Sequence, residues 1–147
     1  MKARDTKDVK IAFQMPIYPM IDHRMITDSS KMTSSPVWDT KSNNFAWNHY
    51  LKGVKNKEIP AYASPSLNSD YTDFPPTISF VGELEPFKDE TIAYINALEK
   101  AGIPTMFKVY EKAFHGFEAV AYKTTIGKSA NQFQVNAFAE YFDNYIK

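Results

Sequence analysis

The stretch that most constrains the fold is T-I-S-F-V-G-E-L-E-P-F-K-D-E, which occupies residues 77–90. Residues 77–81 are apolar or β-branched and lie between Pro76 and Gly82, which is typical of a buried strand. The residues that follow form an acidic turn. From Glu85 or Pro86 onward, apolar side chains recur at helical spacing as far as about Ala101. The stretch therefore predicts a strand, an acidic turn and a helix in direct succession.

A histidine follows the next predicted strand. This strand, T-M-F-K-V-Y, covers residues 105–110, and F-H-G-F at residues 114–117 lies in the turn region 111–118 after it. An acid after one strand and a histidine after the next match the last two members of a Ser–His–Asp/Glu triad in that chain order. The first member would be a serine in a G-x-S-x-G turn, a pattern that this sequence does not contain.

The remaining elements complete an alternating pattern. They are a mostly apolar strand over residues 10–15, a helix from Asp39 or Thr40 to about Lys52, and a helix from Ser129 to Ile146. Pro16 fits poorly beside a strand, because proline cannot donate to a ladder. Strands that alternate with helices predict a parallel sheet with helices on both faces. We expect one α/β domain over residues 1–147, with three layers and about three parallel strands, and a lid-like excursion over residues 20–75.

Composition narrows the class of protein. The 17 Lys and Arg residues balance the 17 Asp and Glu residues, which argues against a nucleic-acid or anionic-membrane partner. No apolar run approaches the ~20 residues of a membrane helix, and residues 1–8 lack the apolar core of a signal peptide. The absence of cysteine excludes a disulfide frame and a thiol nucleophile. We expect a cytoplasmic protein.

Five segments in sequence resemble a known family. They are Tyr18-Pro19-Met20 followed by Asp22, Ser29-Ser30, Tyr62-Ala63-Ser64-Pro65, the segment 82–90, and His115-Gly116-Phe117. With these segments the chain resembles the C-terminal half of an α/β-hydrolase of the hormone-sensitive-lipase group, the branch of bacterial acetyl esterases and carboxylesterases. The resemblance covers roughly residues 1–147 and implies a partial α/β-hydrolase fold.

The resemblance also implies roles for individual residues. Glu85 stands where most members of the group carry the catalytic Asp, and Asp89 is an alternative acid because Glu has an extra methylene. His115 corresponds to the catalytic histidine. The oxyanion loop and the nucleophile elbow of the group precede everything in this sequence, and residues 1–8 resemble the end of the helix that follows the nucleophile. No cofactor is implied.

Other polar and aromatic residues have weaker functional interpretations. Trp38, Phe45, Trp47 and Tyr50 either line an acyl pocket in the lid region or serve only in packing. We expect His23 and His49 to be surface or loop histidines. No metal site is expected, because the three histidines lack the spacing of metal ligands. We also expect no nucleophile among Ser34, Ser35 and Ser64, because none lies in a G-x-S-x-G turn.

Three functional hypotheses follow. In the favoured one, the chain is a fragment or decayed relative of a carboxylesterase that has no turnover alone. In the second, another chain supplies the nucleophile and the pair hydrolyses small acyl esters. In the third, the chain is a non-enzymatic binding or oligomerisation module. We also expect self-association through the strand 10–15, because an apolar strand that loses its neighbour is a template for pairing.

Overall fold

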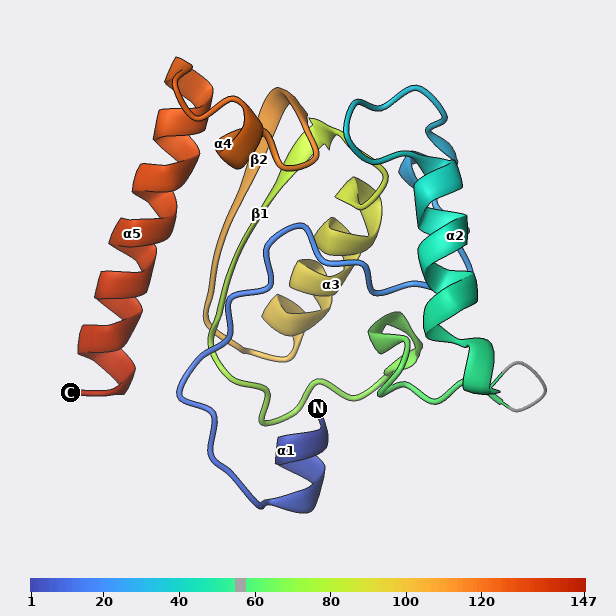
Figure 1. Cartoon of the computed structure of the whole chain (residues 1–147). Coiled ribbons are helices and arrows are strands. Elements are labelled where there is room, and N and C mark those ends of the chain that lie inside the picture. Colours follow the sequence, from blue (N-terminus) through green and yellow to red (C-terminus); the bar gives the residue numbers. More distant parts are fainter. Residues whose placement is uncertain (55–57) are drawn as a thin grey trace.

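A two-stranded parallel sheet organises the computed structural model, which describes residues 1–54 and 58–147 (Figure 1). Strand β1 spans Thr77–Leu84 and strand β2 spans Thr105–Phe114, paired from Thr77 with Thr105 onward. Helix α3, Lys88–Lys100, connects them in a β-α-β unit. The predicted strands 77–81 and 105–110 are confirmed, and both continue past their predicted ends.

Helices cover the two faces of this sheet. Helix α5, Thr125–Tyr145, lies on one side of the strands and α3 on the other (Figure 1). On the α5 side, Ile78 packs with Ala137 and Tyr141. On the α3 side, Ile95 and Leu98 pack in a separate cluster. The predicted three-layer α/β arrangement is therefore confirmed.

The helix boundaries differ from prediction where capping groups decide them. Helix α5 begins before the predicted Ser129, because the Thr124 hydroxyl accepts the Gly127 N–H at 3.1 Å and caps the first turn. Helix α3 begins at Lys88 and not at Glu85 or Pro86. The Glu85 carboxylate accepts the Gly82 N–H, which keeps residues 85–87 in a turn ahead of the helix.

The predicted strand 10–15 is wrong, and the sheet has two strands where about three were expected. The segment runs beside β1 but forms only one parallel bridge, between Gln14 and Thr77. The Gln14 N–H donates to the Pro76 carbonyl, and the Gln14 carbonyl accepts the Ile78 N–H. Further along, the Tyr18 N–H donates to the Phe80 carbonyl at 3.0 Å. Pro16 lies between them without an N–H to donate, and Tyr18 has a left-handed φ of 33°. These two residues interrupt the ladder.

Residues 20–75 carry short helical elements outside the sheet. Helix α2 spans Thr40–Tyr50, close to the predicted helix, and the Asp39 side chain accepts the Ser42 N–H and caps its first turn. Short 3₁₀ turns cover Ser29–Lys31, Lys52–Val54 and Pro65–Leu67, and helix α1 covers Lys2–Thr6. Residues 55–57 of the predicted lid-like excursion 20–75 lie outside the described residues. Among the helices described, none is long and apolar enough to cross a membrane.

Candidate active site

Glu85 lies at the carboxyl end of β1 and is completely buried. Both of its carboxylate oxygens have partners: Oε1 accepts the Gly82 N–H at 2.8 Å, and Oε2 is 2.7 Å from His115 Nδ1. A Cβ at position 82 would collide with the backbone carbonyl of Ala113. Glycine at position 82 therefore allows the two strands to approach while its N–H binds the carboxylate.

A bulge in β2 brings His115 to this carboxylate. Gly82 pairs with Tyr110, but Leu84 pairs with Phe114, so β2 contains two more residues than β1 across this stretch. Lys112 adopts a left-handed φ of 57° in the bulge, and its N–H donates to Glu83 Oε2 at 2.8 Å. The predicted turn region 111–118 is thus wrong in its first half, because the strand continues through the bulge to Phe114.

Three aromatic rings surround the imidazole of His115. The ring centroids lie 4.3 Å away for Tyr18, 5.2 Å for Phe87 and 5.9 Å for Trp38. The His115 side chain keeps 17% of its surface exposed. Within the described residues its Nε2 has no hydrogen-bond partner. The imidazole is therefore held on its Nδ1 side and accessible on the other.

This geometry suits general-base chemistry. A carboxylate only accepts hydrogen bonds, so the Glu85 contact assigns the ring proton to Nδ1 and leaves a lone pair on Nε2. An imidazole in that tautomer can take a proton from a hydroxyl, and the buried carboxylate stabilises the imidazolium that results.

Asp89, the alternative acid, has different partners. Its Oδ2 accepts the Ser29 N–H at 2.8 Å, and Oδ1 lies 3.3 Å from the Lys88 ammonium. Burial acts to raise the pKa of Asp89, but the Ser29 N–H and Lys88 outweigh it and hold the pKa below its usual value. The carboxylate therefore attaches the 3₁₀ turn Ser29–Lys31 to α3. Among the described residues, Asp89 makes no hydrogen bond or ion pair with His115.

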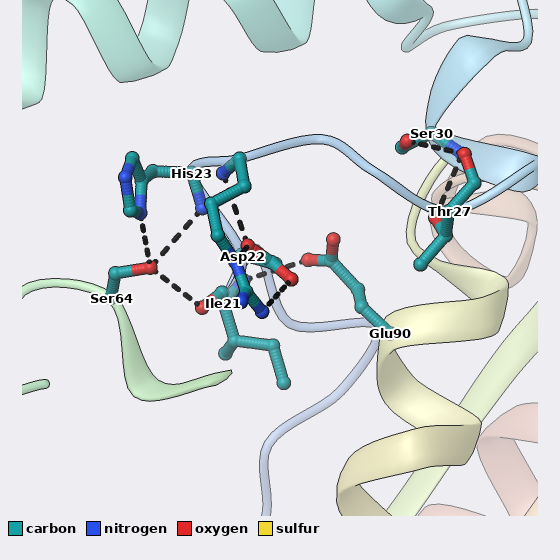
Figure 2. A network of polar contacts seen from close by, with 8 residues as sticks. Ile21, Asp22, His23, Thr27, Ser30, Ser64 and Glu90 are labelled. Carbon is teal, nitrogen blue, oxygen red and sulfur yellow. Dashed lines mark hydrogen bonds and ion pairs between the residues drawn. The ribbon is translucent and has the colours of Figure 1, made fainter. Parts of the chain in front are cut away.

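A second histidine, His23, contacts the side chain of Ser64 (Figure 2). His23 Nδ1 is 2.8 Å from Ser64 Oγ, and the same oxygen accepts the His23 N–H and donates to the Ile21 carbonyl. Ser64 is completely buried. The nearby Asp22 carboxylate binds the Arg24 guanidinium at 2.7 Å and does not orient the imidazole. The pair joins two loops and exposes no nucleophile.

The four candidate pocket aromatics are separated in the structure. Only Trp38 lies next to His115. Trp47 is buried against His23, whereas Phe45 and Tyr50 are 66% and 61% exposed. Tyr18 and Phe87 are ring neighbours of His115 that the sequence-based site did not include. The only sequence signal for Tyr18 was its place in the Tyr18-Pro19-Met20 segment of the family resemblance.

The third histidine, His49, lies in α2. His49 Nδ1 contacts the Phe45 carbonyl at 2.9 Å within α2. Across residues 1–54 and 58–147, no three His, Cys, Asp or Glu residues are placed to hold a metal ion.

Comparison with known proteins identifies the family. A family model described as alpha/beta hydrolase fold matches residues 1–119. The chain belongs to the α/β-hydrolase family. Esterase LipI of Mycobacterium tuberculosis is 25% identical over 121 residues, which cover 82% of this chain and 38% of LipI.

Two solved esterases extend this likeness to the structure. Esterase LipW from Mycobacterium marinum superimposes with a TM-score of 0.87 at 28% identity, covering 95% of this chain and 44% of LipW. A bacterial heroin esterase gives a TM-score of 0.82 at 31% identity, covering 88% of this chain and 42% of that enzyme. This α/β-hydrolase chain spans less than half the length of each of the three esterases. Its predicted kinship with bacterial esterases is confirmed.

Proposed function

We propose that this chain provides the acid and base of a carboxylic ester hydrolase site, with His115 as the base and Glu85 as the acid that orients it. The 2.7 Å contact between His115 Nδ1 and Glu85 Oε2 carries the proposal. The esterase names of LipW and the heroin esterase support it. The substrate class is a small acyl ester.

The remaining groups of the reaction come from outside these 147 residues. The sequence contains neither G-x-S-x-G nor an H-G-G-G loop. In the complete site, His115 Nε2 takes the proton of a serine hydroxyl as its oxygen attacks the ester carbonyl. The same nitrogen returns the proton to the departing alcohol, and a water molecule then releases the acid in a second cycle. We therefore expect no turnover from the chain alone, which is the favoured hypothesis from the sequence.

The test compares the isolated chain with a completed hydrolase. We define the completed hydrolase as a chimera in which this chain replaces the matching 44% of LipW. Hydrolysis of p-nitrophenyl acetate is expected from the completed hydrolase and not from the isolated chain. Turnover by the isolated chain that depends on His115 and Glu85 would contradict the proposal. So would a completed hydrolase that folds but does not turn over.

The open side of the segment 10–18 supports a docking surface for the nucleophile-bearing half. Gln14, Tyr18 and the Pro16 carbonyl face β1, and in an extended chain residues 13, 15 and 17 direct their backbone groups the opposite way. Among the described residues, the backbone N–H groups of Phe13, Met15 and Ile17 have no hydrogen-bond partner. Such an edge is suited to accept another strand.

Self-association through this edge is the state we propose for the isolated chain. The neighbouring side chains Val9 and Ile11 are 61% and 44% exposed. Replacing both with Lys should convert a dimer into a monomer in light-scattering measurements, because charge on an edge opposes pairing. Val135→Lys is the matched control, since Val135 is 64% exposed on α5. A monomeric unmodified chain at micromolar concentration would refute self-association and leave the esterase proposal to its own test.

A further inference from the structure

Tyr18 occupies a strained position beside the candidate base. Its φ of 33° is uncommon for a residue with a side chain and unfavourable for a bulky one. The backbone is held there by the bond from its N–H to the Phe80 carbonyl. Its ring meets Phe80 edge-on at 5.7 Å and His115 edge-on at 4.3 Å. The strain is thus maintained at the residue whose ring is nearest to the imidazole.

A hydrogen bond fixes the other end of this side chain. The Tyr18 hydroxyl donates to Glu118 Oε1 at 2.6 Å. Glu118 is 7% exposed and lies in the first turn of helix α4, Phe117–Val120, which begins directly after His115-Gly116. Its second oxygen, Oε2, is buried without a partner in the part of the chain described. Within the described residues, the Tyr18 hydroxyl is therefore the side-chain donor to this carboxyl.

The bond persists over the ordinary pH range. Burial, followed by the hydrogen bond to Glu118, raises the pKa of Tyr18 well above its usual value. The hydroxyl keeps its proton and remains a donor. By contrast, the indole Nε1 of Trp38, another ring neighbour of His115, is buried and has no partner among residues 1–54 and 58–147. Of the surrounding rings, Tyr18 has the firmest attachment.

We propose that Tyr18 and Glu118 form a brace that positions the imidazole of His115. Glu85 fixes the ring through Nδ1, and the Tyr18 ring limits its rotation from the side. Glu118 in turn fixes Tyr18 and ties the segment 10–18 to the helix that follows His115. Both are positioning residues, and the inference rests on the proposed roles of Glu85 and His115.

Imidazole NMR on the isolated chain tests the brace without any turnover. Tyr18→Phe should speed exchange of the His115 Nδ1 proton with water by roughly tenfold and shift the ring-carbon protons, because it keeps the ring but removes the hydrogen bond. Tyr141→Phe is the matched control. Tyr141 is also buried, and its hydroxyl donates to the Thr77 carbonyl at 3.3 Å, away from His115.

Substitutions at the other end of the brace make the test independent of one variant. Glu118→Gln retains an acceptor oxygen for Tyr18 and should preserve the His115 signals, whereas Glu118→Leu should reproduce the effect of Tyr18→Phe. The brace is refuted if Tyr18→Phe and Glu118→Leu leave the His115 signals unchanged, or if Tyr141→Phe moves them equally. Should Tyr18→Phe fail to fold, the two Glu118 variants decide.

Kinetics of the completed hydrolase then separate positioning from stability. Tyr18→Phe should lower kcat by about 10-fold to 100-fold with little change in KM, because a misplaced base affects the chemical step and not ester binding. Equal kcat values would refute a positioning role. A completed hydrolase without turnover would refute the proposed function, whereas the NMR result would still report on the brace.

Discussion

Two histidines of this chain make contacts of almost the same length with different consequences. His115 Nδ1 lies 2.7 Å from the Glu85 carboxylate, and His23 Nδ1 lies 2.8 Å from the Ser64 hydroxyl. Seen only as side-chain types, the second pair resembles a nucleophile and its base more closely. The surroundings of each pair in the fold favour the first pair for the proposed catalytic role.

The difference lies in what each partner oxygen already binds. Ser64 Oγ is buried and is engaged by two backbone groups, so it has neither access nor freedom to attack a substrate. Glu85 has Oε1 fixed by the backbone N–H of Gly82 and presents Oε2 to His115. A buried carboxylate that orients a partly exposed histidine suits that histidine to act as a base. A buried hydroxyl that contacts a histidine stabilises the fold instead.

The largest expected effect is a loss of turnover when His115, but not His23, is replaced. In the completed hydrolase, His115→Gln should reduce kcat for p-nitrophenyl acetate by ~10³-fold or more, because loss of the base removes proton transfer in both steps. His23→Gln, the matched control, should stay within about threefold, as expected of a residue outside the site. Comparable losses in the two variants would show that the pairs have been assigned wrongly.

A second substitution pair distinguishes the two acids. Glu85→Gln should lower kcat by about 10²-fold to 10⁴-fold, because an amide no longer selects the Nδ1–H tautomer as a carboxylate does. Asp89→Asn makes the same chemical change four positions later, where the recorded contacts are to Ser29 and Lys88. It should chiefly reduce stability. A larger kcat loss in Asp89→Asn would transfer the acid role to Asp89.

The structural role of the second pair predicts a stability effect. Ser64→Ala should lower the free energy of unfolding by ~1–3 kcal/mol, because it removes a buried hydroxyl that bonds the His23 backbone and side chain. Urea denaturation of the isolated chain measures this change. The His115 NMR signals should remain in place; if they move, the two regions are coupled.

The smallest predicted effect concerns Glu90, whose Oε1 accepts the Ile21 N–H at 2.7 Å close to the His23 pair (Figure 2). Burial raises the pKa of Glu90 from 4.5 to about 8. The folded state then keeps a proton that the unfolded chain releases, so this stabilisation is complete below pH 4.5 and is lost as the pH rises through 8. Between pH 6 and pH 7 the free energy of unfolding should fall by about 1.4 kcal/mol from this group.

Comparison with Glu90→Gln isolates that contribution. The variant has no titrating group at this position, so its unfolding free energy should depend less on pH over the same interval. Other groups that titrate in this range are common to both proteins and cancel in the difference. Parallel pH profiles for the two proteins would show that Glu90 is ionised in the folded state.

Local sequence signals were sufficient for the centre of the fold. The apolar run before Gly82 and the run 105–110 specify strands through residues that are close in sequence, and the acid and histidine follow their ends. The β-α-β connection then brings the two ends together. The contact between Glu85 and His115 could be anticipated for this reason.

Features that depend on distant residues were not predictable in the same way. Glu118 is a charged residue in a short helix, and only the arrival of Tyr18 from a hundred positions away explains its burial. The strand 10–15 was expected from its apolar residues, whereas Pro16 and the left-handed Tyr18 decided its pairing. Trp38 could not be separated from Phe45 and Tyr50 by composition.

The bulge in β2 restricts how this region of the chain can vary in length. Between Tyr110 and Phe114 the strand contains two residues more than its neighbour, and pairing resumes between Leu84 and Phe114, directly before His115. A single inserted or deleted codon here would turn the histidine toward the opposite face of the sheet, away from Glu85. Changes of two residues would keep its direction. We therefore expect natural length differences at this point to occur in even steps.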